Sequence, residues 1–294
     1  MINTLQSINI KREKTQLVLM NIYNLPPIPK VISEALKLLD SKTTNVAEIN
    51  RVISKDQSLV SKILLIANSP FYGLQRKVTS VEFAILILGF AEIKNIISVL
   101  SLIEAFKNKS DVYLDQKDFF LHSFITGTAT KNIAENLGFP NSGEAFVAGF
   151  LHDIGISIMH KFFHSNFITI CGLVENTGMS YYEAEMDVLG MTHEQIGNFL
   201  VERWNFPETI CDSILNHHTP EYSKNSLVLS SIIHLADYMT QVLKVGSFKW
   251  DKDLTFTSNS KIIFGFKNDD ELDRYIDNYK ESFTKQIESV SHLV

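Results

Sequence analysis

The residues of this sequence that are best suited to chemistry are histidines and aspartates spread over its second half. Their centre is the adjacent pair His152 and Asp153, which follows the almost unbroken apolar run of residues 145–151. A purely structural helix would continue there with Leu or Ala. A buried, ionised Asp costs several kcal/mol or more unless a cation or hydrogen-bond donors compensate its charge. Asp153 therefore needs a partner elsewhere in the chain.

Other imidazole and carboxylate groups could supply that partner. Their order along the chain is His, His-Asp, His, His-His, Asp, and they are His122, His152-Asp153, His193, His217-His218 and Asp237. A simpler explanation exists for each one alone, such as a hydrogen-bonded core histidine or an exposed His pair favoured by a helix dipole. That explanation accounts poorly for the whole order, so we predict that these residues meet in one pocket.

Helical signals place the first members of this set. His122 shares one face with Ile125 and Ala129 on a helix predicted over residues 116–137. Adjacent residues on a helix diverge by about 100°, so His152 and Asp153 reach one site together only near a helix end. Gly155, just after the pair, is typical of such an end.

The later members also lie near predicted helix ends. A capping box that starts at Thr192 puts His193 in the first turn of a helix through residue 204. The pair His217-His218 closes the next helix, because Pro220 forbids its continuation. Asp237 lies within the amphipathic segment 227–245.

The first half of the chain shows helical periodicity and no catalytic pattern. Apolar spacing predicts five short helices between residues 30 and 106, with N-caps at Asn45, Asp56 and Thr79, the last in a capping box with Glu82. Gly89 closes the fourth helix. Residues 1–24 read as a leader, either loosely attached or a short helix.

Composition narrows the class of protein. The 294 residues are 45% hydrophobic and 20% charged with a net charge of −6, which is typical of a soluble globular protein and argues against a general nucleic-acid surface. No apolar run approaches the length of a membrane span and no signal-peptide core is present, so we expect a cytoplasmic protein without membrane contact. Cys171 and Cys211 indicate two buried thiols.

Ordered short motifs in the first half resemble the HDOD domain, the HD-related output domain of bacterial signalling proteins. The motifs are Leu25-Pro26-Pro27-Ile28-Pro29, Ile53-Ser54-Lys55-Asp56, Ala67-Asn68-Ser69-Pro70-Phe71-Tyr72-Gly73, Val81-Glu82-Phe83-Ala84 and Leu88-Gly89. The resemblance runs from about Leu25 to His218. It implies an all-α fold and a relation to the HD superfamily of metal-dependent phosphohydrolases, in a family whose members are mostly regarded as regulatory.

The resemblance also implies a metal-ligand set. His122, His152, Asp153 and Asp237 match the four core ligands of the superfamily, and His193, His217 and His218 match the extra histidines of its two-metal branch. In that branch the residue matching Asp153 bridges the two metals. Imidazole with carboxylate and without thiolate suits Fe, Mn, Ni or Zn, as one ion or two. Such ions activate water and clamp a phosphoryl group.

Two positions depart from the catalytic branch. Ile156 stands where a Lys usually follows His-Asp-Ile-Gly, and Thr219-Pro220-Glu221 follows the His pair without the adjacent Glu or the Gly-Tyr-Pro segment. We therefore expect a signalling output module that acts through contacts with other signalling proteins and retains the metal constellation. The alternative is a metal-dependent phosphohydrolase acting on a nucleotide or cyclic nucleotide, with a nucleotide as its ligand.

The expected architecture is all-α, with a five-helix N-terminal unit packed on an HD-like helical unit. The expected parts are a leader at 1–24, the N-terminal unit at 25–110, the HD-like unit at 111–245 and a C-terminal part at 246–294. Within the last part, residues 248–266 are expected to be irregular and residues 270–294 helical. His160, His164 and His292 have no place in the metal pattern and read as surface or core residues.

Overall fold

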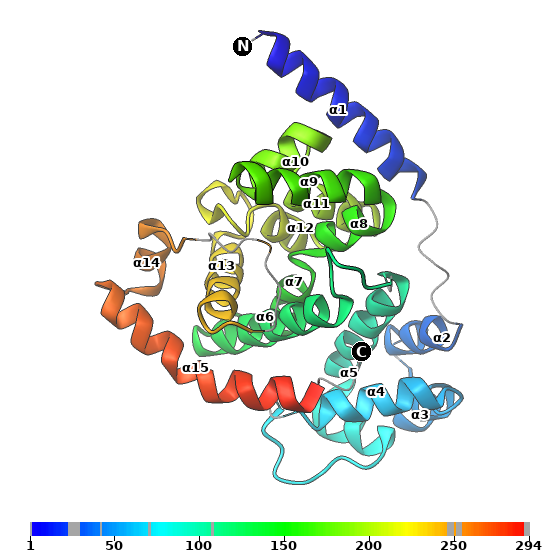
Figure 1. Cartoon of the computed structure of the whole chain (residues 1–294). Coiled ribbons are helices and arrows are strands. Elements are labelled where there is room, and N and C mark those ends of the chain that lie inside the picture. The colour runs from blue at the N-terminus through cyan, green and yellow to red at the C-terminus, as the bar shows by residue number, and fades with distance from the viewer. Residues whose placement is uncertain are drawn as a thin grey trace. The chain divides into compact units, whose positions relative to one another are not determined.

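Every regular element in the described part of the chain is a helix (Figure 1). The computed structural model describes residues 2–22, 30–41, 43–69, 72–106, 109–245, 250 and 255–290. The all-α fold expected from the sequence is therefore confirmed. The Leu25–Pro29 motif, Pro70 and Phe71, Phe248 and His292 lie outside the described residues.

The chain divides into two compact units. One comprises residues 1–24 and 108–273, and the other comprises residues 25–107 and 274–294. The packing of one unit on the other stays a prediction. All seven candidate metal ligands belong to the first of these units.

The helices of residues 25–107 are α2 (Lys30–Leu39), α3 (Val46–Ile53), α4 (Gln57–Ala67) and α5 (Val81–Phe106). Helix α5 packs against the other three. The predicted caps at Asn45 and Asp56 are confirmed, since each side chain accepts a hydrogen bond of 3.0 Å from the backbone three residues on. The predicted capping box at Thr79 is wrong, because Ser80 accepts the bond from the Phe83 amide at 3.1 Å.

Helix α5 contradicts the expectation that no apolar run approaches the length of a membrane span. Its residues 81–101 are long and apolar enough to cross a membrane by length and composition alone, with a mean hydropathy of 2.0. Gly89, however, has φ 82° and ψ 165°, so two helices meet there at a break. The predicted helix end at Gly89 is confirmed. Ile93, Ile96 and Ile97 of the second part are fully buried, whereas Leu86 and Ile87 of the first part are exposed.

The unit that holds the candidate ligands is built around α6 (Gln116–Asn136), which packs against α7 (Ser142–Leu151) and α13 (Leu227–Val242). Helix α11 (His193–Arg203) packs against α8 (Ile154–Phe162) and α12 (Glu208–Leu215). Helix α9 (His164–Thr177) contacts α8 and α10 (Tyr181–Leu189). Helices α7 and α12 also contact each other and α13, so these helices surround one region of the unit.

The segment expected as a leader contains helix α1 (Ile2–Asn21), which packs against α10. Thr15 is buried and its hydroxyl donates to the Leu189 carbonyl at 2.7 Å. A side chain at Gly190, whose φ is +68°, would meet the backbone of Arg12 at 2.6 Å, so α1 lies directly on this glycine.

The C-terminal part is more regular than expected. A short helix, α14 (Ser258–Phe264), lies in the segment predicted to be irregular, because Thr257 caps its start and Gly265, with φ 72°, ends it. Helix α15 (Asp269–Val290) follows, as predicted for the C-terminal helix. Its predicted apolar stripe includes Leu272, Ile276 and Phe283, all of which are buried.

Candidate metal centre

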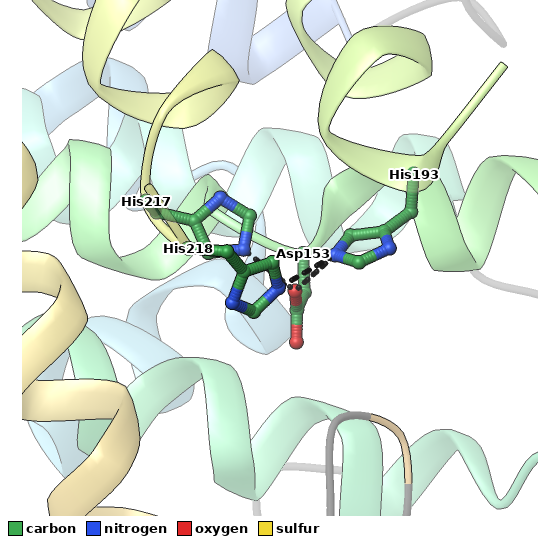
Figure 2. A group of neighbouring side chains, drawn as sticks. All are labelled: Asp153, His193, His217 and His218. Carbon is green, nitrogen blue, oxygen red and sulfur yellow. Dashed lines mark hydrogen bonds and ion pairs between the residues drawn. The ribbon is translucent and has the colours of Figure 1, made fainter. Parts of the chain in front are cut away.

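The structure places all seven predicted site residues in one cluster. Figure 2 shows the side chains of Asp153, His193, His217 and His218 converging, with Asp153 between the histidines. His122 comes from the second turn of α6 and Asp237 from the middle of α13. His217 and His218 lie just beyond α12 rather than in its last turn, because Asn216 already ends that helix.

One half of the cluster consists of His122, His152 and Asp237 together with one oxygen of Asp153. The Nε2 atom of His122 lies 3.3 Å from Asp153 Oδ2, Asp237 Oδ1 and His152 Nε2. The Nε2 atom of His152 lies 3.2 Å from Asp153 Oδ2 and 3.7 Å from Asp237 Oδ1. Donor atoms bound to one ion at about 2.1 Å lie about 3.0 to 3.4 Å apart, so this spacing fits a single ion.

The other half consists of His193, His217 and His218 together with the second oxygen of Asp153. Asp153 Oδ1 lies 3.5 Å from His217 Nε2 and 3.6 Å from His193 Nε2. The Nε2 atoms of His193 and His218 are 3.0 Å apart. The ligand atoms that these residues offer, with one from Asp153, all lie within 4.8 Å of one another. These two groups are the first half and the second half of the cluster.

The rings of His152 and His217 are oriented by backbone carbonyls. The Nδ1 atom of His152 lies 2.8 Å from the Gly149 carbonyl oxygen, and that of His217 lies 2.7 Å from the Ile214 carbonyl oxygen. A carbonyl only accepts, so each Nδ1 carries the proton and, in the neutral ring, Nε2 is left with its lone pair toward the cluster. This is the tautomer that a metal ion requires.

His122 is oriented in the same sense by Thr240. The Thr240 hydroxyl donates to the Asp237 carbonyl at 2.7 Å, so it accepts from His122 Nδ1 at 3.3 Å. The Nε2 lone pair of His122 then faces the cluster. Lone pairs of His122 and His152 thus face each other at 3.3 Å, which requires a cation between them, either a proton or a metal ion.

Glu185, which the sequence patterns did not indicate, contacts the cluster from behind His193. This fully buried carboxylate on α10 accepts from the His193 backbone at 2.8 Å, and its oxygens lie 3.0 and 3.1 Å from His193 Nδ1. The indole of Trp250 donates to the same carboxylate at 2.8 Å. A carboxylate behind a histidine fixes the ring and raises its basicity toward a metal. Its position eight residues before His193 gives no short-range signal in the sequence.

Gly155 has a different role from the predicted one. Helix α7 does end beside His152, but Gly155 is the second residue of α8 and does not terminate a helix. A Cβ atom there would lie 2.0 Å from the His193 carbonyl oxygen. Glycine therefore allows the starts of α8 and α11 to touch, which brings Asp153 beside His193.

The cluster is buried, so its ionised carboxylates would destabilise the fold unless a cation compensated their charge. His122, His152, Asp153, His193, His217 and Asp237 are each at most 2% exposed, whereas His218 is partly exposed. The four carboxylate oxygens of Asp153 and Asp237 are buried, and none accepts a hydrogen bond of normal geometry from the described residues. Buried polar atoms are nearly always satisfied, so these oxygens fit a site that binds a cation.

The pKa shifts in the cluster also indicate that its carboxylates favour a neighbouring positive charge. Burial by itself lowers the pKa of His152, but the carboxylates of Asp153 and Asp237 overcome this and raise its pKa to about 10. Burial raises the pKa of Asp153 and of Asp237, but the neighbouring histidines hold both well below their usual range. A protonated His152 therefore offsets part of the carboxylate charge when no metal is bound.

Other buried groups near the cluster support its ligands. His234, which is fully buried on α13, hydrogen-bonds the His217 carbonyl oxygen through Nδ1 at 2.9 Å. The Glu194 carboxylate lies 3.6 Å from His193 Nδ1. Burial raises the pKa of Glu194, but His193, His218 and His217 lower it to about 2. His160 and His164 lie apart from the cluster, beside Asp111.

Comparisons with known proteins agree with this fold. The family model of the HDOD domain matches residues 25–220. A solved HDOD domain protein from Geobacter sulfurreducens is 23% identical with a TM-score of 0.78, over 98% of this chain and 99% of that one. A protein of Shewanella amazonensis SB2B, provisionally described as a phosphohydrolase, is 21% identical with a TM-score of 0.72, over 93% and 97% of the two chains.

Two further relatives differ from this chain in length. A protein of Marinobacter aquaeolei VT8, provisionally described as a signal transduction protein, is 21% identical with a TM-score of 0.71, and the match covers 97% of this chain but 66% of that one. An uncharacterized protein of Treponema pallidum is 20% identical over 217 residues, 72% of this chain and 42% of that protein. This chain therefore spans less than half the length of that curated relative.

Proposed function

This chain belongs to the HDOD family, and on that premise we propose that it is a signalling output protein that binds divalent transition metal in its second helical unit. In this proposal the metal-loaded unit acts through contacts with other signalling proteins. The ions are Fe, Mn, Ni or Zn, because the donors are imidazole and carboxylate without thiolate. We further propose that it works in the cytoplasm without binding nucleic acid or membrane.

The observation that carries the metal proposal is the position of Asp153. Its two oxygens face different groups of histidine nitrogens, at 3.2 and 3.3 Å on one side and 3.5 and 3.6 Å on the other. The Nε2 atoms of His122, His152 and His217 face inward because their Nδ1 atoms are held elsewhere. A carboxylate placed in this way fits a bridge between two ions, one in each half of the cluster.

Three features favour an output role over hydrolysis. Ile156, at the position where the catalytic branch carries a Lys, is fully buried and supplies no cation for a phosphate. The described ion-pair partners of Asp153 and Asp237 are all histidines. Six of the seven ligands are buried, which limits the access of a substrate.

The second candidate function is a metal-dependent phosphohydrolase acting on a nucleotide or cyclic nucleotide. The partial exposure of His218 favours it, because this residue gives the second half of the cluster one side that solvent reaches. When bound, paired ions activate a water and clamp a phosphoryl group. His122, His152 and Asp237 would hold one ion and His193, His217 and His218 the other, with Asp153 shared.

Metal analysis followed by an activity assay separates these functions. The full chain, Asp153→Ala and the exposed control Asp277→Asn are purified, their metal content is counted, and each is assayed with Mn²⁺ or Fe²⁺ on a panel of nucleotide phosphodiesters. Metal without turnover in the full chain, reduced in Asp153→Ala and kept in Asp277→Asn, supports the output role. Turnover that disappears with the metal in Asp153→Ala supports the enzyme. A full chain that takes up no metal contradicts both.

A further inference from the structure

A second group of metal-binding side chains lies outside the cluster described above and shares no residue with it. Asp111 precedes α6, His160 is in the last turn of α8, and His164 is the first residue of α9. Their ligand atoms all lie within 4.8 Å of one another. We propose that these three side chains bind a single Zn²⁺ ion.

The two oxygens of Asp111 have separate tasks. Oδ1 accepts from the backbone amides of Tyr113 and Leu114 at 2.8 and 3.0 Å, which fixes the turn before α6. Oδ2 faces the histidines, 2.9 Å from His160 Nε2 and 3.5 Å from His164 Nε2. Ligands of a tetrahedral Zn²⁺ at about 2.1 Å lie about 3.4 Å apart, so small adjustments complete the site.

A simple hydrogen bond between His160 and Asp111 would explain only one of these contacts. It would not need His164, whose ring meets that of His160 edge to face at a centroid distance of 5.1 Å. The spacing of four residues across the joint between α8 and α9 gives both Nε2 atoms access to the same oxygen. Convergence of two imidazoles on one carboxylate oxygen is the arrangement that a first-row divalent ion uses.

The surroundings match a site with three protein ligands and one open position. The His160 side chain is 1% exposed, Asp111 is 29% exposed and His164 is 50% exposed. The ion would therefore be held from the inside and reached by water from the outside, as in zinc sites with an open position. The Gln116 amide lies 3.5 Å from His160 Nδ1 and, turned so that its oxygen accepts, would orient the ring for the metal.

Binding there would join two segments that are distant in the sequence. The turn at Asp111 leads into α6, and the joint at His160 and His164 follows α8, which begins beside Asp153. An ion would link these segments as a short cross-link. We therefore expect Zn²⁺ to raise the midpoint of thermal unfolding through this site in addition to any effect at the buried cluster.

The experiment counts Zn²⁺ in the full chain and in three single variants by equilibrium dialysis and elemental analysis. Asp111→Asn retains an Oδ1 acceptor for the turn but places an amide NH₂ toward the histidines. His164→Ala removes an exposed ligand without opening the core. Asp277→Asn is the matched exposed control. We expect Asp111→Asn and His164→Ala to bind one ion fewer than the full chain and Asp277→Asn to bind the same number.

A fourth variant distinguishes metal bound at the buried cluster from metal bound at Asp111. Asp153→Asn should lose buried ions and keep the ion at Asp111, so the two sites fail independently. Replacement of Zn²⁺ by Co²⁺ gives a second readout, a visible absorption difference between the full chain and His164→Ala. The proposal is overturned if His164→Ala, folded by circular dichroism, binds as much Zn²⁺ as the full chain. Equal losses in His164→Ala and Asp277→Asn would overturn it too.

Discussion

The two halves of the buried cluster share one carboxylate and differ in almost everything else. The first half takes His122 from α6, Asp237 from α13 and His152 from the turn that follows α7, and all three are buried. The second half takes His193 from the start of α11 and His217 and His218 from the segment just beyond α12, and His218 is partly exposed. The first half includes a second carboxylate, Asp237, whereas the second relies on imidazoles around one oxygen of Asp153. We infer that the first half holds its ion more tightly and exchanges it more slowly.

The groups that orient the ligands differ as well. In the first half, the Gly149 carbonyl and the Thr240 hydroxyl hold the histidine rings. In the second half, the Ile214 carbonyl holds His217 in the same way, but the buried carboxylate of Glu185 holds His193. A charged acceptor increases the basicity of the imidazole more than a neutral one does, so Glu185 partly offsets the lower charge of the second half. Each prediction below tests one side of this contrast.

The largest expected effect is that of Asp153→Asn. This change removes the shared charge without changing the side-chain volume, so both ions should be lost. Asp237→Asn should remove only the ion of the first half. The measurement is metal content after dialysis, with Asp277→Asn as the control. Equal metal loss in Asp153→Asn and Asp237→Asn would mean that the halves do not act separately.

The next largest effect is expected for Gly155→Ala. The added Cβ would lie 2.0 Å from the His193 carbonyl oxygen, so α8 and α11 must separate. Overpacking of this kind costs about 1–3 kcal/mol, and we expect the upper end because both partners are backbone. Unfolding in urea measures the cost, and metal counting should show loss from the second half alone. Unchanged stability would contradict the close contact. Gly172→Ala, where the atom nearest to the added Cβ lies 3.9 Å away, serves as the control.

Glu185→Gln should have a smaller effect, confined to the second half. Loss of a carboxylate that supports a ligating histidine weakens metal binding by about 10- to 100-fold. Thr240→Val is the matched change behind His122 and should weaken only the first half, by less, because it removes a neutral partner. Competition with a chelator of known affinity measures both. A larger loss in Thr240→Val than in Glu185→Gln would reverse the proposed order.

The smallest effect concerns pH. In the metal-free protein, burial opposes protonation of His152, but Asp153 and Asp237 raise its pKa to about 10 from 6.5. Its contribution to stability is therefore complete below pH 6.5 and is lost as the pH rises toward about 10. Metal replaces the proton and binds more tightly over that interval. Urea unfolding with and without Zn²⁺ should diverge as the pH rises; parallel curves would contradict this prediction.

The sequence was informative about helices because their signals are local. Asn45 and Asp56 cap the helices they were expected to cap, and Thr192 forms its capping box with Gln195. The error at Thr79 has a local cause too, since Ser80 beside it is an equally good cap. The helix α14 escaped notice because it is short and lies between aromatic and polar residues without a clear period.

The sequence was sufficient to predict which residues form the candidate site. It was not sufficient to predict the residues that hold those ligands in place. His122 and Asp237 could be chosen because a chemical pattern joins residues far apart in the chain. Glu185 and Thr240 could not, because their roles depend on which helices touch. The close contact at Gly155 was hidden for the same reason: a glycine that allows two helices to meet looks, in sequence, like one that ends a helix.

The hydrogen bond from Trp250 to Glu185 has a practical consequence for dissecting the chain. The family match ends at residue 220, and Asp237 and Trp250 both lie beyond it. Trp250 also stacks on Phe167 and Tyr181, at centroid distances of 4.7 and 4.0 Å. A fragment cut at residue 245 would keep every candidate ligand of the buried cluster but would deprive Glu185 of its indole donor. A fragment that ends where the family match ends would therefore lack the Trp250 indole, which donates to the carboxylate that holds His193 in place.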